Sequence, residues 1–132
     1  MGQVVQVQAE GGLVEPGSDD PIPVPSGQKV TLMDVIWNIP GAEGQAVRFR
    51  FLAPAVSKEG GTVSGAAVQA DMMALCRDYA LRRVNATSGP KPAQIIISLS
   101  DRPVPFGEAH PEATQYFESY ALEDGDCVWS LF

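Results

Sequence analysis

The chain has 132 residues, the length of one domain, and its 45% of apolar residues is enough to form a hydrophobic core. Its 9 basic and 16 acidic residues give a net charge of -7 at pH 7, which disfavours binding to nucleic acid and to anionic membranes. No apolar run is long enough to cross a bilayer, so we expect neither nucleic-acid binding nor a membrane span.

Residues 1–27 are expected to form a flexible leader, because their second half is crowded with glycine, proline and acidic residues. Such a segment buries too little apolar surface to offset the conformational entropy that it loses on ordering. We therefore expect the folded part of the chain to be a single domain that spans residues 28–132.

Two strands are expected at the start of this domain, over residues 29–37 and 46–52. The first is rich in valine, leucine and isoleucine. In the second, Val47, Phe49 and Phe51 alternate with arginines, and this period of two is typical of a strand with one buried face. The two strands are expected to pair as an antiparallel hairpin.

One helix is expected over residues 65–84, following Ser64, whose hydroxyl side chain is typical of an N-cap. The helix should end before the proline- and glycine-rich residues 87–92. One stripe of this helix should face the core, and at the helical period it consists of Val68, Met72, Leu75, Cys76 and Tyr79.

Three further strands are expected towards the end of the chain. The consecutive isoleucines of residues 93–100 indicate a central strand that is covered on both faces. Residues 115–122 are expected to form another strand, in which Tyr116, Glu118, Tyr120 and Leu122 lie on one face and the residues between them on the other. The turn-forming residues 123–126 then lead into a last strand over residues 127–132. The order β-β-α-β-β-β predicts an α+β fold, with a mostly antiparallel sheet and one helix packed on one face.

The only two cysteines, Cys76 in the helix and Cys127 in the last strand, are expected to form a disulfide. An even number of cysteines in a small acidic chain suits an oxidising compartment, and a helix packed on the sheet would bring the two together. The alternative is a pair of reduced cysteines in the core, where free cysteine is common. We expect no metal site, because two distant cysteines and one histidine lack the number and spacing of zinc ligands.

The loop over residues 101–114 is the candidate binding site, because long ordered loops in small domains are often functional. Phe106 would be an exposed anchor in such a site. The simpler alternative, favoured on these residues alone, is that Val104 and Phe106 cover the edge of the sheet. The candidate binding residues in this loop are Asp101, Arg102, Phe106, Glu108 and His110.

The most distinctive stretches of the chain are ADMMALCRDYAL (70–81), PAQIIISLSDRPVPFGE (92–108) and PEATQYFESYALEDGDCVW (111–129). Together they resemble a family of small exported alphaproteobacterial proteins, chiefly from Rhodobacter-like organisms, that has no assigned function. The resemblance covers residues near 24 to 132. Because members of that family typically begin with a signal peptide, the resemblance implies export and an oxidised pair of cysteines. It implies no catalytic or binding residue.

We expect a periplasmic or secreted binding or interaction domain without catalysis or cofactor, acting on a protein or small ligand through the sheet face or the 101–114 loop. This location assumes that a signal peptide has been removed, since the first residues show none. One alternative is a small enzyme that uses loop carboxylates and His110. Another is a structural or assembly protein that recruits a partner by strand addition. No oligomeric state is indicated.

Overall fold

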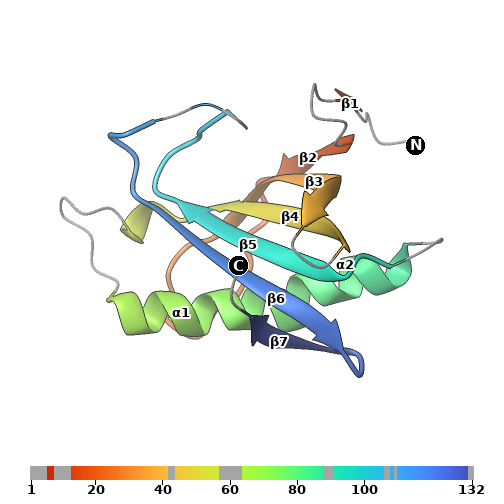
Figure 1. Ribbon diagram of the computed structural model, residues 1–132. Helices are drawn as coiled ribbons and strands as arrows, with labels where there is room; N and C mark the ends of the chain where they lie inside the picture. The colour runs from red at the N-terminus through yellow and green to blue at the C-terminus, as the bar shows by residue number, and fades with distance from the viewer. Residues whose placement is uncertain are drawn as a thin grey trace.

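The computed structural model describes residues 6–7, 13–41, 44–56, 64–87, 91–105, 108 and 110–130. In that part of the chain, one seven-stranded sheet has its strands side by side in the order of the sequence. A long helical segment packs on one face of this sheet (Figure 1). The structure confirms the predicted α+β fold with a mostly antiparallel sheet.

The bounds of the elements agree with most of the predicted ranges. The strands are β1 (Gln6–Val7), β2 (Leu13–Ser18), β3 (Thr31–Gly41), β4 (Gly44–Leu52), β5 (Gln94–Ser100), β6 (Gln115–Glu123) and β7 (Asp126–Ser130). A short 3-10 helix, η1 (Pro54–Val56), follows β4. The long helical segment consists of α1 (Gly65–Ala74), a π-helical stretch η2 (Leu75–Ala80) and α2 (Leu81–Ala86).

Neighbouring strands pair antiparallel, except that β4 and β5 run parallel because the helical segment crosses from one end of the sheet to the other between them. Ser64 is the N-cap of α1, since its side chain accepts a hydrogen bond from the Ala67 N–H at 3.2 Å. The β6–β7 hairpin turns at Asp124 and Gly125, whose positive φ angles of 54° and 77° are those of a tight two-residue loop.

The main core lies between the sheet and the helical segment. Val47, Phe49 and Phe51 of β4 are fully buried on this side, as their alternation predicts. The helical stripe meets them, with Val68, Met72, Leu75 and Cys76 each at most 1% exposed. Burial of each large apolar side chain contributes about 1.5–3 kcal/mol, so this interface provides most of the driving force for folding.

The structure differs from the expected flexible leader, because Leu13–Ser18 form β2 and pair with β3. A methyl group at Gly17 would lie 2.0 Å from the carbonyl oxygen of Leu32, so this position accepts only glycine. A glycine that suggests flexibility in the sequence is therefore required by the close approach of two strands.

The chain after β2 is fixed to the helix by Asp71, whose side chain is fully buried. Its carboxylate accepts hydrogen bonds from the Ser26 N–H at 2.9 Å, the Ser26 hydroxyl at 2.5 Å and the Gln28 amide at 2.7 Å. Ile22 and Val24 of the same segment pack against the main core. These residues, expected to lie in the leader, belong to the folded body.

Candidate functional site

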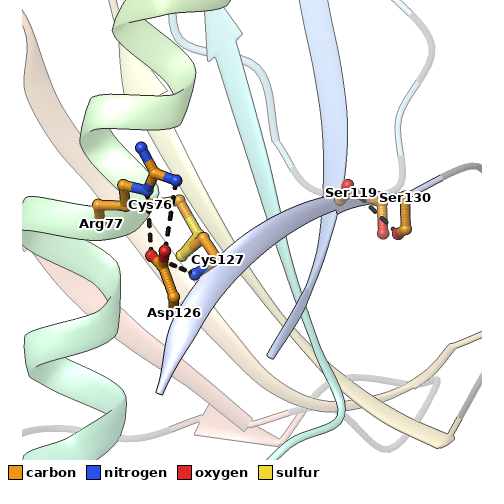
Figure 2. Close-up of a disulfide and its surroundings, with 6 residues drawn as sticks. All are labelled: Cys76, Arg77, Ser119, Asp126, Cys127 and Ser130. Carbon is orange, nitrogen blue, oxygen red and sulfur yellow. Dashed lines mark hydrogen bonds and ion pairs between the residues drawn. A yellow bond between two sulfur atoms is a disulfide. The ribbon is translucent and has the colours of Figure 1, made fainter. Parts of the chain in front are cut away.

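A disulfide joins Cys76 of η2 to Cys127 of β7, with an S–S distance of 2.13 Å (Figure 2). Both residues are buried at the junction of helix and sheet. Beside them, Arg77 and Asp126 form an ion pair at 3.0 Å, and Asp126 also accepts the Cys127 N–H at 2.7 Å. These contacts, that of the Cys127 N–H first, lower the pKa of Asp126. The pairing expected from the sequence is thus present, and it ties β7 to the helical segment.

A groove of about 570 Å³ opens on the same side of the sheet, between α1 and the strands β6 and β7. Its helical wall consists of Ala66, Gln69, Ala70 and Met73, which recur at the spacing of one helix face. The small side chains of the two alanines leave space in this wall beside Gln69 and Met73. Its volume lies within the range of about 300–1,000 Å³ that is typical of ligand sites.

The opposite wall is formed by Glu118 and Tyr120 of β6 and by Trp129 of β7. Glu118 and Tyr120 are two residues apart and therefore lie on one face of the sheet, and Trp129 is the cross-strand partner of Tyr120. The indole N–H of Trp129 donates a hydrogen bond to a carboxylate oxygen of Glu118. Trp129 is 53% exposed, so few packing contacts restrain its ring, and the hydrogen bond to Glu118 holds the ring in one orientation.

Tyr120 is only 2% exposed, and its hydroxyl has no hydrogen-bond partner among the described residues. Burial raises the pKa of Tyr120 to about 12, and the negative charge of Glu118 adds to the effect. The phenol is therefore protonated near neutral pH. The hydroxyl oxygen itself is accessible to solvent where Tyr120 lines the groove, so water or a ligand can bond to it there.

The candidate loop over residues 101–114 is closed at its base by Asp101 and Thr114. The Asp101 N–H donates to the Thr114 carbonyl at 3.1 Å, and the Thr114 N–H donates to the Asp101 carboxylate at 3.0 Å. Arg102 pairs with the same carboxylate at 3.2 Å. Val104 is 4% exposed, which agrees with a covering role for this part of the loop. Phe106 lies outside the described residues.

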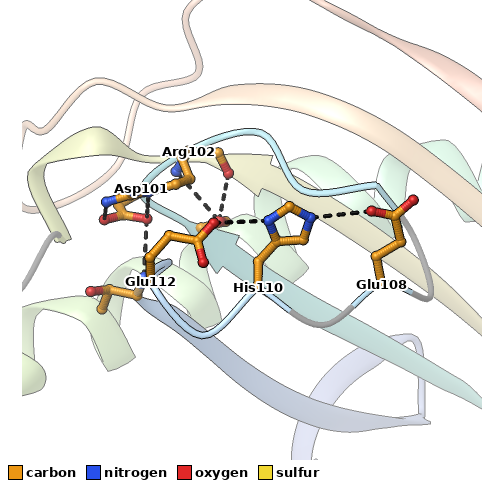
Figure 3. Close-up of polar contacts among 7 residues, drawn as sticks. Asp101, Arg102, Glu108, His110 and Glu112 are labelled. Carbon is orange, nitrogen blue, oxygen red and sulfur yellow. Dashed lines mark hydrogen bonds and ion pairs between the residues drawn. The ribbon is translucent and has the colours of Figure 1, made fainter.

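His110 bridges two carboxylates of this loop (Figure 3). Its Nδ1 lies 3.0 Å from Glu112 and its Nε2 lies 3.2 Å from Glu108. The hydrogen bond with Glu112, followed by that with Glu108, raises the pKa of His110. Both ring nitrogens can donate at once only in the imidazolium form, and the two flanking carboxylates favour that form. The structure thus brings Glu108 and His110 together, without placing either in the groove.

The face of the sheet opposite the helix carries a second, smaller cluster of buried residues, which consists of Ile36, Ala46 and Ile96. Arg50 of this face forms two contacts with Asp34, at 2.7 and 2.9 Å. Phe117 and Val128 are exposed there, although Phe117 lies beneath the guanidinium of Arg48, 5.5 Å from the ring centre. This face therefore mixes buried apolar residues, an ion pair and exposed apolar side chains.

No group of three or more His, Cys, Asp or Glu side chains in the described part of the chain is arranged to hold a metal ion. No helix in these ranges is long and apolar enough to cross a membrane.

Sequence reasoning did not identify the groove, because its residues come from three separate elements. A partial signal was present: the Asp-Gly turn sets the hairpin register that places Trp129 opposite Tyr120. The alternation along β6 likewise places Glu118 on the side of the helix. What the sequence lacks is the position of α1, which decides that Ala66 and Ala70 face this pair.

Comparison with known proteins gives one informative match. No curated protein and no solved structure matches the chain significantly. The model of a family described as a family of unknown function (DUF6497) matches residues 3–132, which include the β2 segment and every residue of the groove and of the disulfide. Since the match extends over nearly the whole sequence, the chain belongs to the DUF6497 family of unknown function.

Proposed function

We propose that this protein is a non-catalytic binding domain of the periplasm or another extracytoplasmic compartment, and that the groove between α1 and β6–β7 is its binding site. The observation that carries the proposal is the pair Trp129 and Tyr120 in the groove wall. One presents an oriented, exposed aromatic ring, and the other presents at the groove a hydroxyl that has no partner among the described residues.

The disulfide supports the proposed location. Disulfides persist in oxidising compartments and are rare in the cytosol, where thiols are kept reduced. The resemblance to exported proteins favours the same location. The bond between Cys76 and Cys127 also contributes to binding, because it fixes the strand that carries Trp129 to the helical segment that forms the other wall. A rigid groove loses little entropy when a ligand binds.

The composition of the groove supports ligand binding. Its wall is largely apolar, with few polar groups, which is the usual anatomy of a ligand site. Binding is favoured over catalysis by the state of these polar groups. Tyr120, with a pKa of about 12, stays protonated and does not act as a base near neutral pH. Glu118 is engaged by the indole of Trp129.

The 101–114 loop is a second candidate surface. Its support is the bridge from His110 to Glu108 and Glu112, which orders one side of the loop. The enzyme alternative is less well supported, because carboxylates of the same loop already engage both ring nitrogens of His110, and neither His110 nor Glu108 lines the groove. Recruitment by strand addition retains support from β7, which is the last strand of the sheet in the described part of the chain.

The groove is tested by blocking it. Ala70→Arg places a long side chain in the groove at an exposed helical position, and Ala86→Arg makes the same change at an exposed position of α2 outside the groove. Both variants are made in a Trp37→Phe background, so that Trp129 is the only tryptophan. A library of small fragments and short peptides is then screened by the emission of Trp129.

The proposal expects ligands that change Trp129 emission in the Trp37→Phe protein and in the Ala86→Arg variant but not in the Ala70→Arg variant. If no ligand distinguishes the two arginine variants, the groove is not the binding site and the proposal is wrong.

A further inference from the structure

Resting on the proposed function, we propose that the groove binds a basic side chain, lysine or arginine, carried by an extended segment of a protein partner. The polar and aromatic groups of the groove meet the needs of a cation on an apolar stem. Four observations lead to this assignment.

The charge of the groove is negative and uncompensated. Glu118 is the only charged residue that lines it, and no arginine or lysine pairs with this carboxylate in the described part of the chain. Trp129 occupies one carboxylate oxygen, and the second has no partner among the described residues. With a net charge of -7, the whole protein attracts cations and repels anionic ligands.

The aromatic ring of Trp129 lies beside this carboxylate. An indole is the side chain whose face attracts cations most strongly, and arginine and lysine are the usual protein partners. The hydrogen bond from the indole N–H to Glu118 holds the ring and the carboxylate together, so that a cation in the groove contacts both.

The hydroxyl of Tyr120 supplies the remaining polar group. It has no partner in the described residues and is accessible where Tyr120 lines the groove, and its oxygen has lone pairs that accept an N–H from an ammonium or guanidinium group. Opposite these groups, Ala66, Ala70 and Met73 form an apolar wall. The methylene groups of lysine and arginine pack favourably on such a surface while their charged ends reach polar partners.

The position of the groove favours a protein segment over a free amine. Trp129 belongs to β7, and no strand pairs with the outer side of β7 in the described part of the chain. The backbone N–H and C=O groups of such an edge are available to an extended peptide. A peptide that pairs with β7 directs alternate side chains towards the helix, on the side where Trp129 lines the groove.

The test uses an array of acetylated and amidated nonapeptides of alternating valine and threonine, in which arginine or lysine is placed at each position in turn. Each basic peptide has a neutral counterpart of nearly the same shape, with citrulline in place of arginine or acetyl-lysine in place of lysine. Binding is measured by titration of Trp129 emission in the Trp37→Phe protein. Butylguanidinium is the free small cation for comparison.

The matched variant is Glu118→Gln, which removes the charge and keeps an oxygen that accepts the Trp129 indole N–H. We expect at least one basic peptide to bind at least tenfold more tightly than its neutral counterpart and at least tenfold more tightly than butylguanidinium. Its affinity should fall at least fivefold in Glu118→Gln, vanish in Ala70→Arg and remain unchanged in Ala86→Arg.

Equal binding of charged and neutral peptides, or equal binding by Glu118→Gln, would overturn the assignment of a cation. Tight binding of butylguanidinium alone, or no binding of any basic peptide, would overturn the assignment of a protein segment. In each of these cases the proposed function survives if the library contains another ligand that Ala70→Arg excludes. If no such ligand exists, both proposals fail together.

Discussion

The carboxylate of Glu118 accepts the indole N–H of Trp129 across the β6–β7 pair, at the wall of the groove between α1 and the sheet. The bond joins the one charge of the groove to its one large exposed aromatic ring. The proposed binding site depends on this pair. Its geometry is therefore the first thing to test.

Replacement of Glu118 by alanine should free the indole, while replacement by glutamine should not, because the amide oxygen still accepts the hydrogen bond. In the Trp37→Phe background, time-resolved emission anisotropy should show faster local motion of Trp129 in Glu118→Ala than in Glu118→Gln. Since the site is partly exposed, the free energy of unfolding should change by less than about 1.5 kcal/mol in either variant. Equal ring mobility in the two variants would show that the carboxylate does not orient Trp129.

Substitution of Gly17 by alanine should destabilise the protein, because the added methyl group meets the Leu32 carbonyl oxygen at 2.0 Å. The backbone of β2 or β3 must move to relieve this contact, and overpacking of this kind costs about 1–3 kcal/mol. The measurement is urea-induced unfolding. Gly65→Ala is the matched control, since a methyl group there meets nothing within 4 Å and alanine favours the helix. Equal stability of the two variants would mean that β2 does not pack on β3 as described.

Removal of the Asp71 side chain should release the segment between β2 and β3 from the helix. Asp71→Ala leaves the Ser26 N–H and the Gln28 amide without their acceptor, and this loss should cost about 2–3 kcal/mol in the free energy of unfolding. Hydrogen exchange at the Ser26 amide should become faster than exchange in β5. The exposed Asp78→Ala, from the same helical segment, should leave both quantities unchanged. Slow exchange of Ser26 in Asp71→Ala would contradict this role.

His110 should titrate above its ordinary pKa of 6.5, because Glu112 and Glu108 stabilise the imidazolium. A raised pKa in the folded state means that the bridge contributes stability fully below pH 6.5 and loses it as pH rises through the folded-state pKa. The chain contains a single histidine, so its imidazole proton resonance reports this midpoint without ambiguity.

The two carboxylates should differ in their effect on this midpoint. Glu112→Gln should lower it more than Glu108→Gln, since the Glu112 hydrogen bond is the larger cause of the shift. A midpoint at or below 6.5 in the unmodified protein would show that the bridge does not form in solution.

Loss of the disulfide should destabilise the protein strongly. The two cysteines are 51 residues apart, and for a loop of this length chain entropy predicts a stabilisation of up to about 4 kcal/mol. Cys76→Ala with Cys127→Ala should therefore unfold at a much lower urea concentration, and reductant should have no further effect on it. If the double variant unfolds at the same urea concentration as the parent protein, the bond does not hold β7 to the helical segment.

The sequence predicted those features that depend on local patterns. The alternation of Val47, Phe49 and Phe51, the cap at Ser64 and the Asp-Gly turn each act within a few residues, and the structure confirms them. The prediction of a flexible segment around Gly17 was wrong, because amino-acid composition indicates the entropy cost of ordering a segment but does not reveal a close contact such as that with Leu32.

The groove was not predicted for a related reason. Its opening depends on the small size of Ala66 and Ala70, and small exposed residues carry no signal of their own in a helix. Only the packing of α1 beneath β6 and β7 turns them into a wall that faces Trp129. The 101–114 loop, in contrast, contains charged side chains and the histidine, and these residue types led the sequence-based prediction to place the binding site there.

The most direct test of the central claim is a titration with the arginine or lysine peptide that binds most tightly, in which two-dimensional ¹⁵N–¹H NMR monitors the resonance of the Trp129 indole N–H. The groove proposal expects this resonance to shift together with the backbone amides of Ala70 and Tyr120, while the resonances around His110 stay in place. Shifts confined to the 101–114 loop, with the Trp129 indole unchanged, would contradict the account and move the binding site to that loop.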